Sequence, residues 1–264
     1  MENKNERDGF SAKIWLHAGL WCYRHWRGKY AAVESLAVAP LVEKTDICLD
    51  IGAHAGSWTL PLAKLVPRGR VYAFEALPYY ARVLKRLCRL FGLSNVVVLN
   101  RAVSNEIGSV ALAWKNNQGR RLTGNTHMAT SAESAEMECV SVPAVTLDRW
   151  QQQLGPAERV GFIKIDVEGA ERLVLRGAEA LIRQRRPVIF MEIVTSCCER
   201  YGYGPADLFQ LFAELGYDAY TVKVLDGQVA LRPSSAQTYP GKGDVLLIPS
   251  GTVLPATFKM EAQA

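Results

Sequence analysis

Short apolar runs alternate along the chain with longer stretches in which apolar positions recur every three or four residues. Apolar runs of this length predict buried strands, and they lie at 46–51, 70–74, 95–99, 161–165 and 188–192. The helical spacing predicts helices at 58–65, 79–91, 170–183 and 205–215. This alternation is typical of a doubly wound α/β domain whose mostly parallel sheet is covered by helices on both faces.

Further strands complete a predicted sheet of about seven. Residues 217–224 and 244–248 predict two strands that pair as an antiparallel edge, whereas 110–114 and 138–142 predict an added hairpin around a polar loop at 115–136. We therefore expect a single domain over residues 1–264, and we divide it into three segments. They are an N-terminal helical preface (1–45), a core (46–249) and a tail (250–264).

The preface carries a basic and aromatic segment at 14–26, which includes Trp15, Trp21 and Trp26. Such a helix can lie on a membrane surface, but packing on its own domain or over a substrate pocket is the favoured interpretation. The first eight residues lack the apolar centre of a signal peptide, and no apolar stretch is long enough to span a bilayer. The sequence therefore predicts a cytoplasmic protein.

The net charge of +5 is mildly basic, and much of it lies in two clusters, at 82–89 and 183–186. Helical spacing places the first cluster on a solvated face, and the second lies at a helix end, where cations suit the helix dipole. Nucleic-acid binding would need aromatic residues interleaved with a basic stripe, and no such pattern is present. A small-molecule substrate is the expected partner, and the sequence does not indicate an oligomeric state.

Acidic residues end four of the predicted strands: Asp50, Glu75, Asp166 and Glu192. Ligands of parallel α/β sheets bind at the carboxyl ends of the strands. Burying a carboxylate is costly, so these side chains are expected to face a cleft there.

The segment after the first strand, Asp50 to Gly56, reads D-x-G-x-x-x-G rather than the dinucleotide pattern G-x-G-x-x-G. Gly52 and Gly56 allow a tight turn and a close approach of the backbone to a ligand. A pyrophosphate would avoid the carboxylate of Asp50, whereas the sulfonium and amino groups of S-adenosylmethionine suit it. Glu75 is placed to accept hydrogen bonds from ribose hydroxyls of either cofactor. A nicotinamide-dependent oxidoreductase and a non-catalytic binding protein of the same fold remain alternatives.

The glycine loop at 50–56 and several further strings along the chain resemble the FkbM-like family of S-adenosylmethionine-dependent methyltransferases. The most specific is Lys-Ile-Asp-Val-Glu-Gly-Ala-Glu at 164–171, and the others are at 74–75, 145–148, 177–178, 187–192, 216–217 and 245–249. The resemblance extends from about residue 46 to 249. It implies a class I, Rossmann-like fold and transfer of a methyl group to a hydroxyl of a sugar, polyketide or other small metabolite. The residues expected to bind the cofactor are Asp50, Gly52, Ala53, His54, Gly56, Glu75, Ala76, Arg101, Ala102 and Asp166.

His54 stands where the family usually has Asn. We expect its side chain near the methionine end of the cofactor, where a packing contact is favoured over a role as a base. His127 lies in the polar loop and matches no residue of the family.

Methylation of an alcohol needs a base or a metal to remove the hydroxyl proton. Asp166 and Glu168 follow the fourth predicted strand and Glu192 follows the fifth, so these three are the predicted catalytic residues, with Asp166 the best placed. Clustered acids raise one another's pKa, which favours proton transfer. A divalent cation bound by the same oxygens is the less favoured alternative, so no metal site is predicted. Glu171 is expected to be solvated or to cap a helix.

Overall fold

The computed structural model describes residues 19–21, 34–115, 126–225 and 228–261. Within these ranges nine strands form one large sheet. In spatial order they are β13 (Lys259–Met260), β11 (Gln228–Pro233), β10 (Tyr217–Leu225), β12 (Lys242–Pro249), β9 (Val188–Val194), β8 (Val160–Ile165), β1 (Ile47–Ile51), β2 (Arg70–Phe74) and β3 (Val96–Leu99).

The five strands from β9 to β3 are parallel, and they are the five apolar runs of the sequence. The predicted antiparallel pair is also confirmed, since β10 pairs with β12 and β12 pairs with β9. The sheet has nine strands rather than about seven, because β11 and β13 extend this edge, and the antiparallel pairs at the edge make the sheet mixed. The apolar run of β11 is only three residues long, too short for a distinct pattern.

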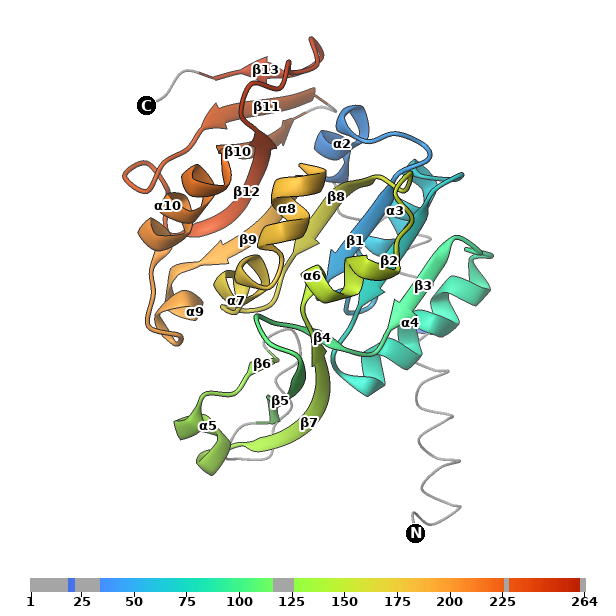
Figure 1. The fold of residues 1–264 in the computed structure, drawn as a ribbon, viewed down its shortest axis with the longest axis vertical. Helices are drawn as coiled ribbons and strands as arrows, with labels where there is room; N and C mark the ends of the chain where they lie inside the picture. Colours follow the sequence, from blue (N-terminus) through green and yellow to red (C-terminus); the bar gives the residue numbers. More distant parts are fainter. Residues whose placement is uncertain (1–18, 22–33, 116–125, 226–227, 262–264) are drawn as a thin grey trace.

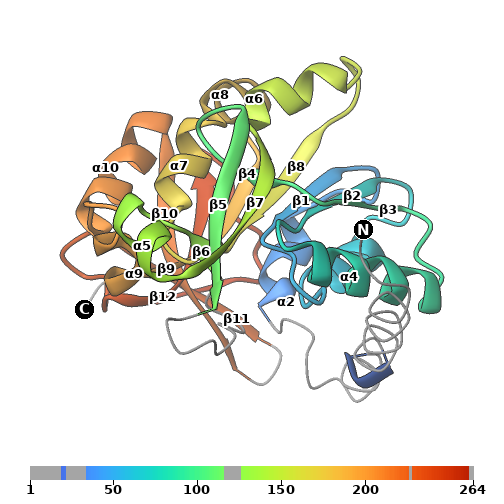
Figure 2. The same ribbon diagram turned by 90° about the horizontal axis from the view of Figure 1, so that it is seen from below.

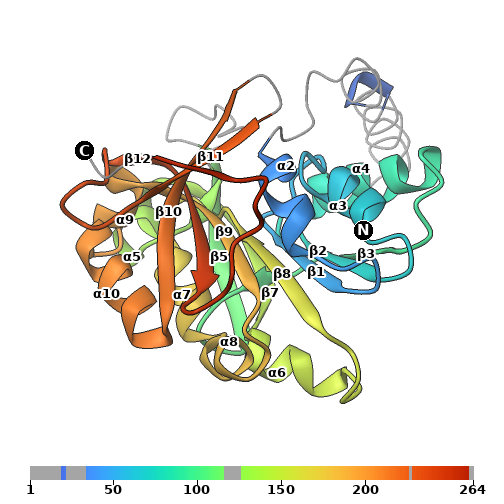
Figure 3. The same ribbon diagram turned by 90° about the horizontal axis from the view of Figure 1, so that it is seen from above.

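Helices cover both faces of the large sheet, as the two views along the sheet show (Figures 2 and 3). One face carries α2 (Ser35–Val38), α3 (Thr59–Leu65) and α4 (Pro78–Leu90), with the 3-10 turn η1 (Ala39–Leu41). The other carries α6 (Leu147–Trp150), α7 (Glu171–Arg176), α8 (Glu179–Arg185) and α10 (Pro205–Leu215), with η2 (Gln151–Gln153); α9 (Thr195–Glu199) follows β9.

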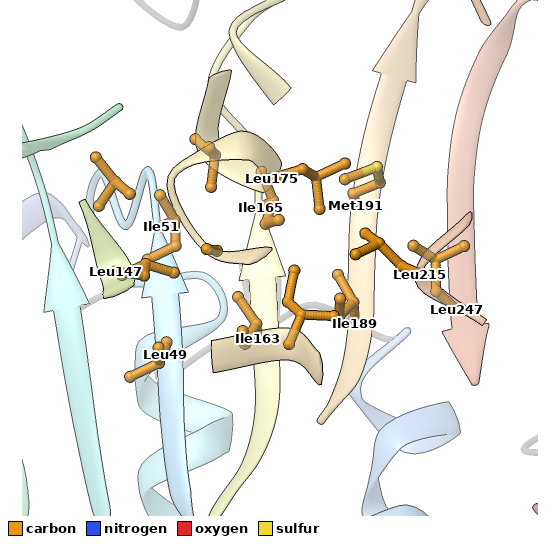
Figure 4. Close-up of a cluster of buried hydrophobic side chains, with 14 of the residues drawn as sticks. Leu49, Ile51, Leu147, Ile163, Ile165, Leu175, Ile189, Met191, Leu215 and Leu247 are labelled. Carbon is orange, nitrogen blue, oxygen red and sulfur yellow. The ribbon is translucent and has the colours of Figure 1, made fainter. Parts of the chain in front are cut away.

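The core lies in two layers, because alternate residues of each strand point to opposite faces. On the α6–α8 face the strands contribute side chains that pack against Leu147, Leu175 and Leu215 (Figure 4). The labelled strand residues are Leu49, Ile51, Ile163, Ile165, Ile189, Met191 and Leu247. On the other face Phe162 and Phe190 pack against Trp58 of the loop before α3. Burial on both sides explains why these strands are continuous apolar runs.

The single helix predicted over 170–183 was wrong, since α7 ends at Arg176 and α8 begins at Glu179. A Cβ on Gly177 would lie 2.0 Å from the backbone oxygen of Ser104. Only glycine therefore fits where this segment passes the backbone of Ser104. The Asp148 carboxylate accepts the N–H groups of Ala180 and Leu181 at 3.0 and 2.8 Å and so caps α8. Residues 145–148 and 177–178, two of the segments that resemble the FkbM-like family, therefore lie against each other at the start of α8.

A second, four-stranded sheet is formed by described residues between β3 and β8. It contains β4 (Ala102–Val103), β7 (Glu138–Val145), β5 (Gly108–Lys115) and β6 (His127–Met128), with α5 (Ser131–Glu136) after β6. β5 and β7 are antiparallel, which confirms the predicted hairpin. The small sheet and α5 lie beyond the end of the large sheet where the β1 and β8 arrows stop (Figure 1). We call this unit the added sheet.

Most of the expected preface lies outside the described residues. Trp21, which is described, packs with Ala55, Val83 and Leu87 on the core domain. None of the helices described is long and apolar enough to cross a membrane. The cations at the end of α8 lie as predicted: Arg183, Arg185 and Arg186 donate to carbonyl oxygens, among them those of residues 214–216.

Candidate active site

A cavity of about 310 Å³ opens at the carboxyl ends of β1, β2 and β8, between the large sheet and the added sheet. This volume is at the lower end of the usual range for small-molecule sites. Its wall is formed by Ile51, Gly52, His54, Ser57, Phe74, Glu75, Ala76, Leu77, Tyr80, Arg101, Ala102, Val103, Leu112, Thr126, His127, Met128, Asp166, Val167, Glu168 and Glu192.

The glycine loop after β1 forms the floor of this cavity. Its N–H groups at Gly52 and Ala53 donate to the carbonyl of Phe74 at 2.9 and 3.0 Å. Gly52 has φ +85°, and a Cβ there would lie 1.8 Å from the backbone oxygen of Asp166. The close approach of the loop to the end of β8 therefore requires glycine at position 52, whether or not a ligand is bound. Gly56 has φ +84°, faces leucine side chains of α3 and α4 and, like Ala53, does not line the cavity.

Asp50 lies behind the loop rather than in the cavity wall. Its side chain is 1% exposed and accepts a hydrogen bond of 2.5 Å from the Thr59 hydroxyl, which ties β1 to the start of α3. Burial raises the pKa of Asp50 to about 6. The sequence predicts that Asp50 contacts the cofactor directly. The structure does not support this, because Asp50 does not line the cavity.

Glu75, at the end of β2, joins two loops around the cavity. Its carboxylate accepts the N–H of His54 at 2.7 Å and the N–H of Leu77 at 2.8 Å. Burial raises the pKa of Glu75 to about 7, although both N–H bonds act in the opposite direction. A carboxylate has about four lone-pair sites, so Glu75 can still accept hydroxyl groups from the cavity side.

His54 packs among aromatic rings beside the cavity. Its ring centroid lies 3.9 Å from that of Tyr80 and 5.6 Å from that of Trp21, which meets it edge-on. Burial lowers the pKa of His54 to about 4, against a smaller opposing effect of Asp166. The imidazole is therefore neutral near pH 7 and a weak base, in line with a packing role.

The three predicted catalytic acids meet in the cavity wall, because β8 and β9 are adjacent and parallel. Asp166 and Glu168 follow β8, as predicted. Glu192 lies inside β9 and not after it, since pairing of Glu192 with Asp244 of β12 prolongs the strand. Across all residues described, no group of three or more His, Cys, Asp or Glu side chains is arranged to hold a metal ion.

Glu168 has an unusual backbone conformation. Its φ is +54° and that of Gly169 is +106°, and the guanidinium of Arg200 donates to the Glu168 carbonyl at 3.2 Å. Left-handed conformations of non-glycine residues cost free energy and persist where neighbours hold them. Burial, with the nearby charges of Asp166 and Glu192, raises the pKa of Glu168 to about 7.

This pKa gives a prediction for stability. The folded protein keeps a proton on Glu168 that the unfolded chain releases at its ordinary pKa of 4.5, so ionisation destabilises the fold as the pH rises from there through 7. Glu168→Gln stays neutral and should raise the free energy of unfolding by about 1 kcal/mol near pH 8, allowing for partial solvent screening. Urea denaturation should show no such gain near pH 4. Glu106→Gln, an exposed control, should show no gain at either pH.

Lys164 is a site residue that the sequence pattern alone did not single out. It is 2% exposed, and its Nζ lies 3.3 Å from Oδ2 of Asp166 and 5.8 Å from the ring centres of Trp58 and Phe190. The ion pair holds the Asp166 carboxylate in the cavity wall. A signal was present, since a lysine two residues before Asp166 in a buried strand must share its face of the sheet.

Comparison with known proteins shows the family to which this chain belongs. Residues 50–219 match the family model described as the methyltransferase FkbM domain. The chain belongs to the FkbM family of methyltransferases. Methyltransferase 1 of Beauveria bassiana (strain ARSEF 2860) is 28% identical over 156 residues, covering 54% of this chain and 61% of that protein. The chain thus matches less than two thirds of that relative.

Solved structures with a similar arrangement include methyltransferase FkbM from Methylobacillus flagellatus KT, at a TM-score of 0.48 and 14% identity over 79% of this chain and 45% of that one. A SAM-dependent methyltransferase from Aquifex aeolicus has a TM-score of 0.44 and 17% identity over 83% of this chain and 90% of that one.

The FkbM string at 164–171 has a local structural explanation. Lys164, Asp166 and Glu168 form the ion pair and the acid cluster. The buried Glu171 accepts the N–H of Gly169 at 3.0 Å and the Tyr203 hydroxyl at 3.1 Å. Glu171 is therefore buried rather than solvated, and it holds the turn that precedes α7.

Proposed function

We propose that this FkbM-family chain transfers a methyl group from S-adenosylmethionine to a hydroxyl of a sugar, polyketide or other small metabolite. The observation that carries the proposal is that one cavity has Gly52 and Glu75 at one part of its wall and the Asp166, Glu168 and Glu192 carboxylates at another. A nicotinamide oxidoreductase is less favoured, because the chain lacks G-x-G-x-x-G and belongs to a methyltransferase family.

The residues present fit S-adenosylmethionine. Glu75 suits the ribose hydroxyls, and the apolar side chains of Val103, Leu112 and Met128 suit the flat face of an adenine. Asp166 offers a negative charge to the cationic end. When bound, this cofactor supplies a methyl group already activated by a sulfonium.

The ribose assignment predicts the effect of Glu75→Gln. At pH 8, where Glu75 is ionised, loss of one charged hydrogen bond of about 1.5–3 kcal/mol should weaken binding of S-adenosylhomocysteine about 10- to 100-fold in calorimetry. Gln is preferable to Ala, because its amide oxygen keeps an acceptor for one of the two N–H groups, those of His54 and Leu77, that Glu75 accepts on separate oxygens. Glu106→Gln should bind as the unchanged protein does, and an unchanged affinity in Glu75→Gln would refute the assignment.

In the proposed mechanism two of the acids bind the acceptor and the third accepts its proton. Asp166, fixed by Lys164, and Glu192 accept hydrogen bonds from the acceptor and hold its oxygen in line with the methyl group. Glu168 takes the hydroxyl proton, because a pKa of about 7 suits a base at neutral pH. The oxygen–methyl bond forms as the sulfur–methyl bond breaks, which leaves S-adenosylhomocysteine, a methyl ether and a protonated Glu168.

The test is a transfer assay with methyl-labelled S-adenosylmethionine and a panel of sugars, polyketide alcohols and matched amines. Label recovered in an acid-stable ether of an alcohol, with equimolar S-adenosylhomocysteine, is the expected result. Label found in the amines alone would contradict O-methylation. Tight binding of the cofactor without transfer to any of the panel would favour a binding protein of the same fold.

A further inference from the structure

Glu133 of α5 makes hydrogen bonds in two directions. Its Oε1 lies 3.1 Å from Nε2 of His127 and 3.3 Å from Nε of Arg200. Its Oε2 accepts the N–H and the hydroxyl of Thr130, both at 3.0 Å. Burial acts to raise the pKa of Glu133, but the Thr130 bonds and the proximity of His127 outweigh it and lower the pKa. Glu133 is thus a fixed, charged carboxylate with partners on both sides.

Two of its three partners, His127 and Arg200, connect it to different parts of the cavity wall. His127 belongs to β6 of the added sheet, is 4% exposed and lines the cavity. Arg200 follows α9 and donates to the backbone carbonyl of Glu168, the residue with the left-handed conformation. The neighbouring Tyr201 donates its hydroxyl to the carbonyl of Met128 at 2.6 Å, which joins β6 to the segment after α9 that contains Arg200.

We propose that Glu133 is a positioning residue that fixes His127 and, through Arg200, Glu168 on two sides of the acceptor. The added sheet then supplies part of the acceptor site, with His127 as a further acceptor-binding residue. This inference rests on the proposed methyl transfer, because it assigns the acceptor to the space between the two side chains.

The physical reason is positional accuracy. Strain at Glu168 must be balanced by contacts of its backbone, and the Arg200 bond to its carbonyl is such a contact. Arg200 is itself oriented by Glu133, and a displacement of about 1 Å in a reacting group can cost about 10²-fold in rate. An imidazole held by a carboxylate has a fixed orientation, which favours an acceptor with a second hydroxyl to meet it.

The first test needs no acceptor. In protein labelled with ¹³C at the glutamate carboxyl carbons and free of added cofactor, the Glu168 signal, assigned by its loss in Glu168→Gln, reports the environment of that carboxyl. The groups that face it are Asp166, Glu192, Glu171, Cys197 and Arg200. Glu133→Gln and Arg200→Gln should each move the midpoint by one pH unit or more toward the ordinary range, because the loop relaxes into solvent.

Glu136→Gln is the matched control, since Glu136 is exposed on the same helix, and it should leave the midpoint unchanged. An unchanged midpoint in both Glu133→Gln and Arg200→Gln would overturn the proposal. If Glu133→Gln fails to fold, Arg200→Gln decides alone, because it removes the link to Glu168 and leaves His127 and Thr130 on Glu133.

The second test uses an alcohol methylated in the transfer assay. Glu133→Gln and His127→Gln should raise the acceptor KM at least tenfold and lower kcat, with the affinity for S-adenosylhomocysteine within about twofold of that of the unchanged protein. Equal loss of cofactor affinity and turnover would mean a structural role only. Failure of the proposed function would instead appear as no cofactor binding by the unchanged protein, while the carboxyl titration still reports the Glu133 link.

Discussion

Glu168→Gln is expected to lower turnover by roughly 10²–10⁴-fold, the usual contribution of a general base. Gln has nearly the same shape and hydrogen-bonding reach but cannot take the hydroxyl proton. The backbone contact from Arg200 to the residue 168 carbonyl is retained, so affinity for the cofactor should change little. Methyl transfer at saturating acceptor, measured with calorimetry of S-adenosylhomocysteine, separates the two effects.

The pH profile gives this prediction its control. The pKa of Glu168 is about 7, and only the ionised carboxylate can accept a proton, so kcat/KM of the unchanged enzyme should rise through that pH and level off above it. With S-adenosylmethionine saturating, so that ionisation of Glu75 does not act through cofactor binding, the residual activity of Glu168→Gln should lack this rise. Near-normal turnover in the variant, or the same rise in its profile, would remove Glu168 from the proton path.

Asp166→Asn is expected to reduce turnover by about 10²-fold, because the acceptor loses the charged group that holds its oxygen in line. The same change leaves the buried ammonium of Lys164 without its partner at 3.3 Å, and a buried charge without a partner destabilises a fold. Reduced activity and reduced stability must therefore be separated. Turnover and thermal unfolding should be measured on the same samples.

The double variant Lys164→Met with Asp166→Asn separates them. Met packs well between the rings of Trp58 and Phe190, so stability should recover to a large extent. Turnover should stay low, because the acceptor still lacks the carboxylate. Recovery of both together would show that Asp166 serves the fold and not the reaction.

The central sheet and the place of the acids were predictable from local pattern. The central parallel strands β1, β8 and β9 are buried along most of their length, which requires continuous apolar runs, and acids at the carboxyl ends of neighbouring parallel strands converge. The family strings added the expectation of methyl transfer. Less was predictable at the antiparallel edge, because the apolar run of β11 is only three residues long and such a short run does not distinguish a strand.

The remaining features depend on contacts between residues far apart in the chain. Glu133 and Arg200 are distant in sequence and meet only because the added sheet folds against α9. The left-handed conformation of Glu168 is stabilised by Arg200, which lies in a different segment, so no local sequence preference predicts it. α5 is different, since Thr130 and Glu133 form a capping box, a local pattern that indicates a helix start inside the segment expected to be a polar loop.

The most direct test of the central claim is calorimetric titration of the purified protein with S-adenosylhomocysteine and, separately, with a nicotinamide dinucleotide. We expect one S-adenosylhomocysteine site per chain, with binding weakened about 10- to 100-fold by Glu75→Gln, and no heat from the dinucleotide. Binding of the dinucleotide in its place, or S-adenosylhomocysteine binding indifferent to Glu75, would contradict the claim.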